Sequence, residues 1–137
     1  MRTAGADEYL EVLWDILAAR SPAGVKEIAD RLGISQPSVV QMLDKMKNRG
    51  LVRYEKRTGV NFTAKGARRA RAIVRNHRLM EVLLVRVVGL QSEGAERAVC
   101  GAEHHLSEKA ADSICTFLNH PRHCPHGNEI PRGKCCP

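Results

Sequence analysis

Over residues 25–62 the spacing of the apolar residues changes from helical to alternating. This pattern constrains the fold more than any other feature of the 137-residue chain. A first run at helical spacing ends at Gly33, and a second run opens at Pro37, which suits the first turn of a helix. From Leu51 the period becomes two, interrupted by a turn at residues 56–59. Helix, tight turn, helix and two-stranded ribbon together predict a winged helix-turn-helix.

The rest of the chain is predicted to be helical. Further helical runs fall at residues 7–19, 64–88, 92–105 and 107–118. Aromatic residues make up only 4% of the chain, which suits helices packed with Leu, Val, Ile and Ala better than a β-sandwich. We therefore expect a mainly α fold: a winged helix-turn-helix domain at residues 1–71, followed by an all-helical domain at residues 72–137. Prolines and glycines rule out a regular element in its tail, residues 119–137.

The charge balance favours a polyanionic partner. Lys plus Arg number 22 against 15 for Asp plus Glu, which gives a net charge of +7. The second helix of the pair has a polar outer face, and a helix of this kind fits the major groove of double-stranded DNA. Contacts to bases or phosphates are expected from Ser35, Gln36, Pro37, Ser38, Gln41, Lys45, Lys56 and Arg57. A merely solvated polar face is the alternative interpretation.

Membrane and secreted classes are not expected. No apolar run approaches the roughly 20 residues that a membrane span needs. The first residues lack the basic start and apolar stretch of a signal peptide. The five cysteines are therefore expected to be reduced thiols in the cytoplasm, and their odd number argues against a closed disulfide framework.

Metal-ligating side chains recur at helical spacing in three places. The three sets are Glu8 with Glu11, His77 with Glu81, and Cys100 with Glu103 and His104. Thiolate combined with imidazole and carboxylate suits iron, nickel, cobalt or zinc, whereas oxygen and imidazole ligands suit manganese. Taken singly, each set has an ordinary alternative: a solvated helix start, a surface pair or a packed cysteine.

Several segments together resemble the diphtheria toxin repressor family of metal-activated transcriptional repressors. They are EYLEVLW, VKEIADRLGISQPSVVQMLDKMKNRGLVRYE, NHRLMEVLL, CGAEHHLS and HGNEIP. The resemblance covers residues 6 to about 131. It implies a homodimer that binds a palindromic operator, in which divalent metal organises the dimer and the first helix. The chain stops where iron regulators often continue into an SH3-like domain, so that domain is expected to be absent.

The resemblance also implies ligands and a metal. Cys100, Glu103 and His104 match the family's Cys-x-x-Glu-His motif, and Glu8 falls on its N-terminal ligand. A second site of the iron branch is matched by His77, Glu81 and Glu96, and ligands of the manganese branch are matched by Glu11 and His77. The iron branch usually has Met at the position of Glu8, and the manganese branch has a carboxylate at that of Cys100. Because of the Cys100 thiolate, Fe²⁺ is predicted as the activator ahead of Mn²⁺.

Cysteine and histidine are concentrated in the tail. Cys124, His126, Cys135 and Cys136 offer four nitrogen and sulfur donors, and Cys115 lies just upstream. These residues predict a second metal site, with Zn²⁺ or an iron–sulfur cluster bound. A frayed terminus with reduced thiols is the alternative.

Functional classes besides a metal-activated repressor are less well supported. An enzyme would use His, Cys and Glu as acid, nucleophile and base, but no phosphate loop or nucleophile elbow accompanies them. A metal buffer would use the same ligands, and a regulator that senses redox state through an iron–sulfur cluster would use the tail cysteines. We therefore predict a regulator with no enzymatic activity.

Overall fold

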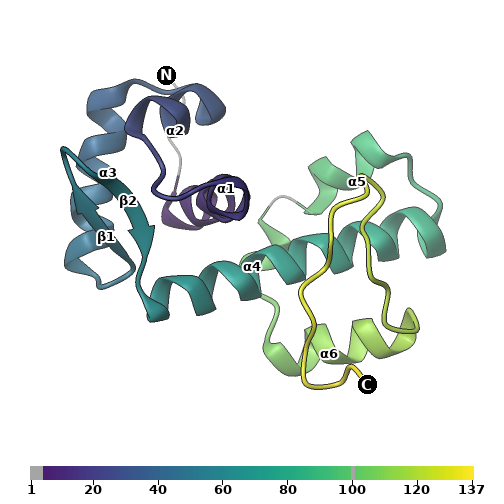
Figure 1. The fold of residues 1–137 in the computed structure, drawn as a ribbon. Helices are drawn as coiled ribbons and strands as arrows, with labels where there is room; N and C mark the ends of the chain where they lie inside the picture. The colour runs from purple at the N-terminus through teal and green to yellow at the C-terminus, as the bar shows by residue number, and fades with distance from the viewer. Residues whose placement is uncertain (1–4, 100) are drawn as a thin grey trace. The chain divides into compact units, whose positions relative to one another are not determined.

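The computed structural model describes residues 5–99 and 101–137 (Figure 1). It divides into two compact units, residues 1–70 and 71–137, which are described separately. No helix in these described ranges is both long and apolar enough to cross a membrane.

The first unit contains three helices and a hairpin. They are α1 (Ala6–Ala19), α2 (Val25–Leu32), α3 (Gln36–Asn48), β1 (Val52–Glu55) and β2 (Gly59–Phe62). The hairpin lies beside α3 (Figure 1). Fully buried side chains from all three helices, among them Leu13, Ile28 and Leu43, form the core. The predicted winged helix-turn-helix is confirmed.

Local chemistry explains why α2 and α3 meet in a tight turn. Gly33 ends α2 in the left-handed conformation, with φ of 67°, which glycine adopts without steric cost. Ser35 caps α3, since its hydroxyl oxygen accepts a hydrogen bond from the Ser38 backbone N–H at 3.3 Å. In the antiparallel hairpin Tyr54 pairs with Val60, and both side chains are buried.

Helix α4 (Ala64–Val82) begins in the first unit and ends in the second. Its start is capped by Thr63, whose hydroxyl accepts from the Gly66 N–H at 3.0 Å. The helix continues as a π-helical turn, η1 (Leu83–Val88), and stops at Gly89, with φ of 87°. The predicted end at residue 88 is therefore confirmed, although the last turn is wider than an α-helix.

The predicted helix over residues 92–105 is wrong beyond its first half. Helix α5 covers only Ser92–Val99, and a separate 3-10 turn, η2, covers Ala102–His104. Between them Gly101 adopts φ of 94°, a conformation that an α-helix does not contain. Glu103 therefore lies on a short turn that follows the helix and not on one continuous helical face.

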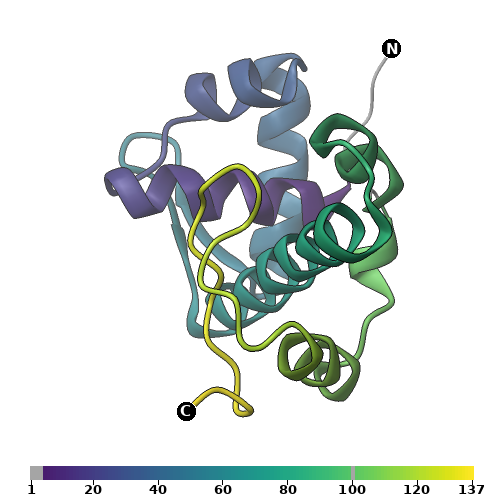
Figure 2. The same cartoon turned by 90° about the vertical axis from the view of Figure 1, so that its right-hand side faces the viewer.

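Helix α6 (Glu108–Phe117) and the tail complete the second unit. Ser107 caps α6 by accepting from the Ala110 N–H at 3.1 Å. The tail runs out from α6 and returns to it (Figures 1 and 2). Its two arms are joined by one β-bridge, between His123 and Glu129. The tail contributes Cys124 and Ile130 to a core whose other members are Leu79, Val82, Ala111, Cys115 and Leu118.

Candidate metal centre and DNA-binding surface

Two buried carboxylates converge on His77. Glu81 lies one turn along α4, and its Oε1 is 2.5 Å from Nε2 of His77. Glu103 comes from η2, and its Oε1 is 3.6 Å from Nδ1 of the same imidazole. Only 3% of Glu81 and 5% of Glu103 is exposed. Carboxylates buried this deeply need a compensating positive charge.

The imidazoles keep both carboxylates ionised. Burial acts to raise the pKa of Glu81, but hydrogen bonds with His77 and His126 and their positive charge outweigh it, so the pKa is lowered. The pKa of Glu103 is also lowered: burial again opposes the shift, and His77 is the first of the groups that outweigh it. His104 adds a second imidazole, with Nε2 3.9 Å from Oε1 of Glu103. Such an arrangement of carboxylates and imidazoles suits a divalent cation.

The other oxygen of Glu81 faces the tail. Oε2 of Glu81 lies 3.1 Å from Nδ1 of His126. Cys124 completes a group whose donor atoms all lie within 4.8 Å of one another. Glu81 belongs to one predicted set and these two tail residues to another, because no helical or knuckle spacing connects positions so far apart.

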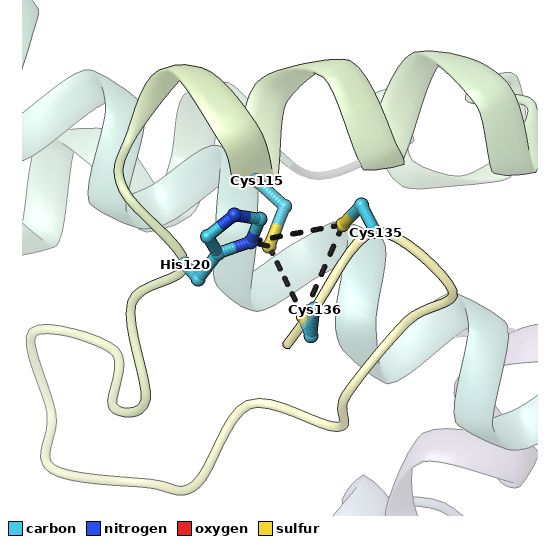
Figure 3. A group of neighbouring side chains, drawn as sticks. All are labelled: Cys115, His120, Cys135 and Cys136. Atoms are coloured by element: carbon cyan, nitrogen blue, oxygen red, sulfur yellow. Dashed lines mark hydrogen bonds between the residues drawn. The ribbon is translucent and has the colours of Figure 1, made fainter.

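The remaining tail cysteines form a separate group. Cys115, His120, Cys135 and Cys136 bring three thiols and one imidazole together (Figure 3). The single set expected from Cys124, His126, Cys135 and Cys136 is therefore divided in two. His120 was not among the predicted ligands. Its position in the turn that follows α6, five residues after Cys115, is the signal that sequence reasoning missed.

The other predicted ligands are distributed as follows. Glu8 and Glu11 lie half-buried on α1 in the first unit. Glu96 is exposed on α5 and belongs to none of the donor groups found among the described residues of its unit. Cys100 lies outside the described residues, so the prediction that it is a ligand has no structural account.

The predicted DNA contacts line an exposed surface of the first unit. Ser35, Gln36, Pro37, Ser38, Gln41 and Lys45 are exposed at and along α3, and Lys56 and Arg57 are exposed at the hairpin turn. Ser35 also has a structural role, because its hydroxyl caps the helix. Basic side chains beside a polar helix face are suited to phosphate contacts that position the helix for base contacts.

Two family models together match most of the chain. Residues 1–60 match the model described as the iron dependent repressor N-terminal DNA binding domain. Residues 63–132 match the model described as the iron dependent repressor metal binding and dimerisation domain. The chain belongs to the iron-dependent repressor family. The resemblance to diphtheria toxin repressor proteins is thereby confirmed.

Individual relatives include both iron and manganese regulators. The iron-dependent repressor IdeR of Mycobacterium leprae is 37% identical over 123 residues, which cover 90% of this chain and 54% of the relative. The regulator MntR of Lysinibacillus sphaericus is 33% identical over an alignment that covers 86% of this chain and 84% of the relative. The solved manganese regulator SloR superposes with a TM-score of 0.82 at 30% identity, over 96% of this chain and 61% of its own. The chain thus spans about half the length of the IdeR relatives. These relatives are named as regulators or repressors and not as enzymes.

Proposed function

We propose that this protein is a metal-activated transcriptional repressor that binds operator DNA as a homodimer. The observation that carries the proposal is the convergence of Glu81 and Glu103 on His77. These buried carboxylates lie in the part of the chain that matches a metal binding and dimerisation domain. The same chain presents an exposed helix-turn-helix with basic residues at its hairpin.

Divalent cations fit the carboxylates and imidazoles around His77. The described candidate ligands are His77, Glu81, Glu103 and His104, and Cys100, Glu8, Glu11 and Glu96 stay predicted ligands. Glu81 faces Nε2 of His77 and Glu103 faces Nδ1, so the two carboxylates lie on opposite sides of the imidazole and do not share one ion through it. A cation bound at either carboxylate would supply positive charge in place of a proton on imidazole. That exchange makes metal binding compete with protonation, and the donors fit first-row divalent metals.

Fe²⁺ is proposed as the activating metal, ahead of Mn²⁺. The thiolate of Cys100 is softer than the carboxylate that manganese regulators carry at this position, and Fe²⁺ lies above Mn²⁺ in the general order of affinities. Glu8 favours the harder Mn²⁺, so the preference is expected to be modest. Relatives named for iron and for manganese match this chain with similar identity.

DNA recognition follows from the exposed face of α3. In a homodimer two such helices are related by a two-fold axis, which predicts an inverted-repeat operator with half-sites one or more helical turns apart. Metal activates binding only if it has higher affinity for the DNA-competent state than for the alternative state.

Selection from a random duplex library followed by footprinting tests this function. Protein loaded with Fe²⁺ under anaerobic conditions, or with Mn²⁺, should enrich one inverted repeat and protect both half-sites from nuclease. Protein in excess chelator should give no protection. A metal buffer or an enzyme would enrich no sequence in either condition, and that result would reject the proposal.

A further inference from the structure

Three thiols and one imidazole meet where the tail returns to α6. Sγ of Cys115 lies 3.7 Å from Sγ of Cys136 and 3.4 Å from Nδ1 of His120. Sγ of Cys135 lies 3.9 Å from Sγ of Cys136 and 3.8 Å from Nδ1 of His120. The four side chains point toward one another from the helix, from the turn that follows it and from the end of the chain (Figure 3).

These separations match the edges of one tetrahedron around zinc. With Zn–S bonds of about 2.3 Å and Zn–N bonds of about 2.0–2.1 Å, two sulfurs lie about 3.8 Å apart and a sulfur lies about 3.6 Å from a nitrogen. The two S–S distances here are 3.7 and 3.9 Å, and the two S–N distances are 3.4 and 3.8 Å. All four donor atoms lie within 4.8 Å of one another, so one ion suffices to contact them all.

Two of the three sulfurs face hydrogen-bond donors. Arg75 is buried, pairs with Asp112 at 2.8 Å, and directs Nη2 to Sγ of Cys135 at 3.4 Å. The backbone N–H of Gly133 donates to Sγ of Cys136 at 3.5 Å. Three thiolates exceed the charge of Zn²⁺ by one, and the Arg75 guanidinium, which also pairs with Asp112, places a positive charge beside this excess. Donors of this kind around ligating groups are typical of built metal sites.

The backbone is also arranged to present the imidazole. Asn119 and His120 adopt φ of 63° and 53°, the left-handed region that non-glycine residues rarely enter. The His120 N–H donates to the Cys115 carbonyl at 2.8 Å, which fixes the turn between these two donors. His120 is thereby held next to the thiol five residues earlier.

We propose that Cys115, His120, Cys135 and Cys136 bind one structural Zn²⁺ ion that fastens the tail to α6. Four protein donors fill a tetrahedral site, which leaves no open position for catalysis or for exchange with substrate. An iron–sulfur cluster is disfavoured because its inorganic sulfides and additional irons would hold the ligand sulfurs farther apart than they lie. This site is distinct from the donors around His77 and does not depend on the proposed repressor function.

The zinc site has a consequence for the loop that it closes. His120 and Cys135 lie at the two ends of the loop that carries His126. His126 is the residue that reaches Glu81. Fastening both ends limits the conformations of the loop, and so places Nδ1 of His126 beside a carboxylate of the candidate metal centre.

The test is the zinc content of the intact chain, purified anaerobically in metal-free buffer and measured without DNA. The wild type should retain about one zinc ion per chain that survives gel filtration. A Cys135→Ser, Cys136→Ser double variant changes two half-buried residues and should lose this zinc. Cys124→Ser is the matched control, because it removes a thiol outside the group, and it should retain the zinc. A Glu81→Gln, Glu103→Gln variant should also retain it.

Two further measurements identify the bound species and its effect. Cobalt substitution of the wild type should give thiolate-to-cobalt charge-transfer absorption that the double variant lacks. Trypsin should cleave after Arg122 or Arg132 faster in the double variant than in Cys124→Ser. Equal zinc in the double variant and the controls would overturn the proposal. Acid-labile sulfide with visible absorption, or a disulfide among these cysteines before any oxidant is added, would also overturn it.

Discussion

Nδ1 of His126 lies 3.1 Å from Oε2 of Glu81, although 45 positions separate the two residues in the chain. The contact links the tail to α4 inside one compact unit. Oε1 of the same carboxylate lies 2.5 Å from His77. Glu81 therefore has an imidazole on each side, and the tail is part of the environment of the candidate metal centre.

Replacing His126 should weaken metal binding to the second unit. His126→Gln removes the imidazole beside Glu81 and should lower the affinity for Mn²⁺ by at least about tenfold, the smaller end of what losing a supporting partner costs. His123→Gln is the matched control, since His123 is exposed on the same loop and in no donor group found among the described residues. Isothermal titration calorimetry of the two metal-stripped variants measures their affinities for Mn²⁺. Equal affinities in the two variants would remove His126 from the site.

Gly66 is predicted to be indispensable to the packing of the first unit. A Cβ there would lie 1.7 Å from the Leu51 carbonyl oxygen, and backbone cannot move aside as a flexible side chain can. Gly66→Ala should therefore destabilise the protein by about 1–3 kcal/mol or more. Gly94→Ala is the control, because no atom lies within 4 Å of a Cβ at Gly94 in α5. Thermal unfolding should show a lower Tm for the first variant only, and equal Tm values would contradict the close approach.

Variants on the exposed face of α3 should distinguish base contacts from phosphate contacts. Gln41→Ala should cost about 1–3 kcal/mol on the selected operator and relax the preference at one base pair. Lys45→Ala should weaken binding to all sequences alike and reduce the salt slope by about one. Lys109→Ala, an exposed lysine on α6, is the control for net charge. If Gln41→Ala lowered specific and non-specific affinity equally, Gln41 would not be a base contact.

Cys100 is predicted to set the metal preference. Cys100→Glu replaces a soft donor with a hard one, which should shift activation of DNA binding toward Mn²⁺. The measurement is the free Fe²⁺ or Mn²⁺ concentration that gives half-maximal operator binding under anaerobic conditions. A wild type that already responds to Mn²⁺ at lower free concentration than to Fe²⁺ would show that the thiolate has been given too much weight.

The local order of elements could be predicted from the sequence because it depends on neighbouring residues. Gly33 ends α2, Ser107 caps α6, and Gly89 ends the π-helical turn, each through contacts within a few positions. The error at residues 92–105 has the same local origin. The predicted helix spans Gly101, which adopts a positive φ and separates α5 from η2.

The composition of the tail sites could not be predicted, because it depends on how the chain folds back. Cys124 and Cys136 lie within one short segment, yet Cys124 joins Glu81 and Cys136 joins Cys115. Spacing rules for zinc knuckles apply only to ligands that share a turn. His77 and Glu81 were found because helical spacing alone places them together.

The most direct test of the account is the affinity of the wild-type protein for its selected operator with and without metal. Fluorescence anisotropy should show tight binding in Fe²⁺ or Mn²⁺ and a loss of at least about tenfold in excess chelator, a coupling of about 1.4 kcal/mol or more. Glu103→Gln should remain folded by circular dichroism and bind weakly in both conditions. Equal operator affinity of the wild type with and without metal would contradict the central claim.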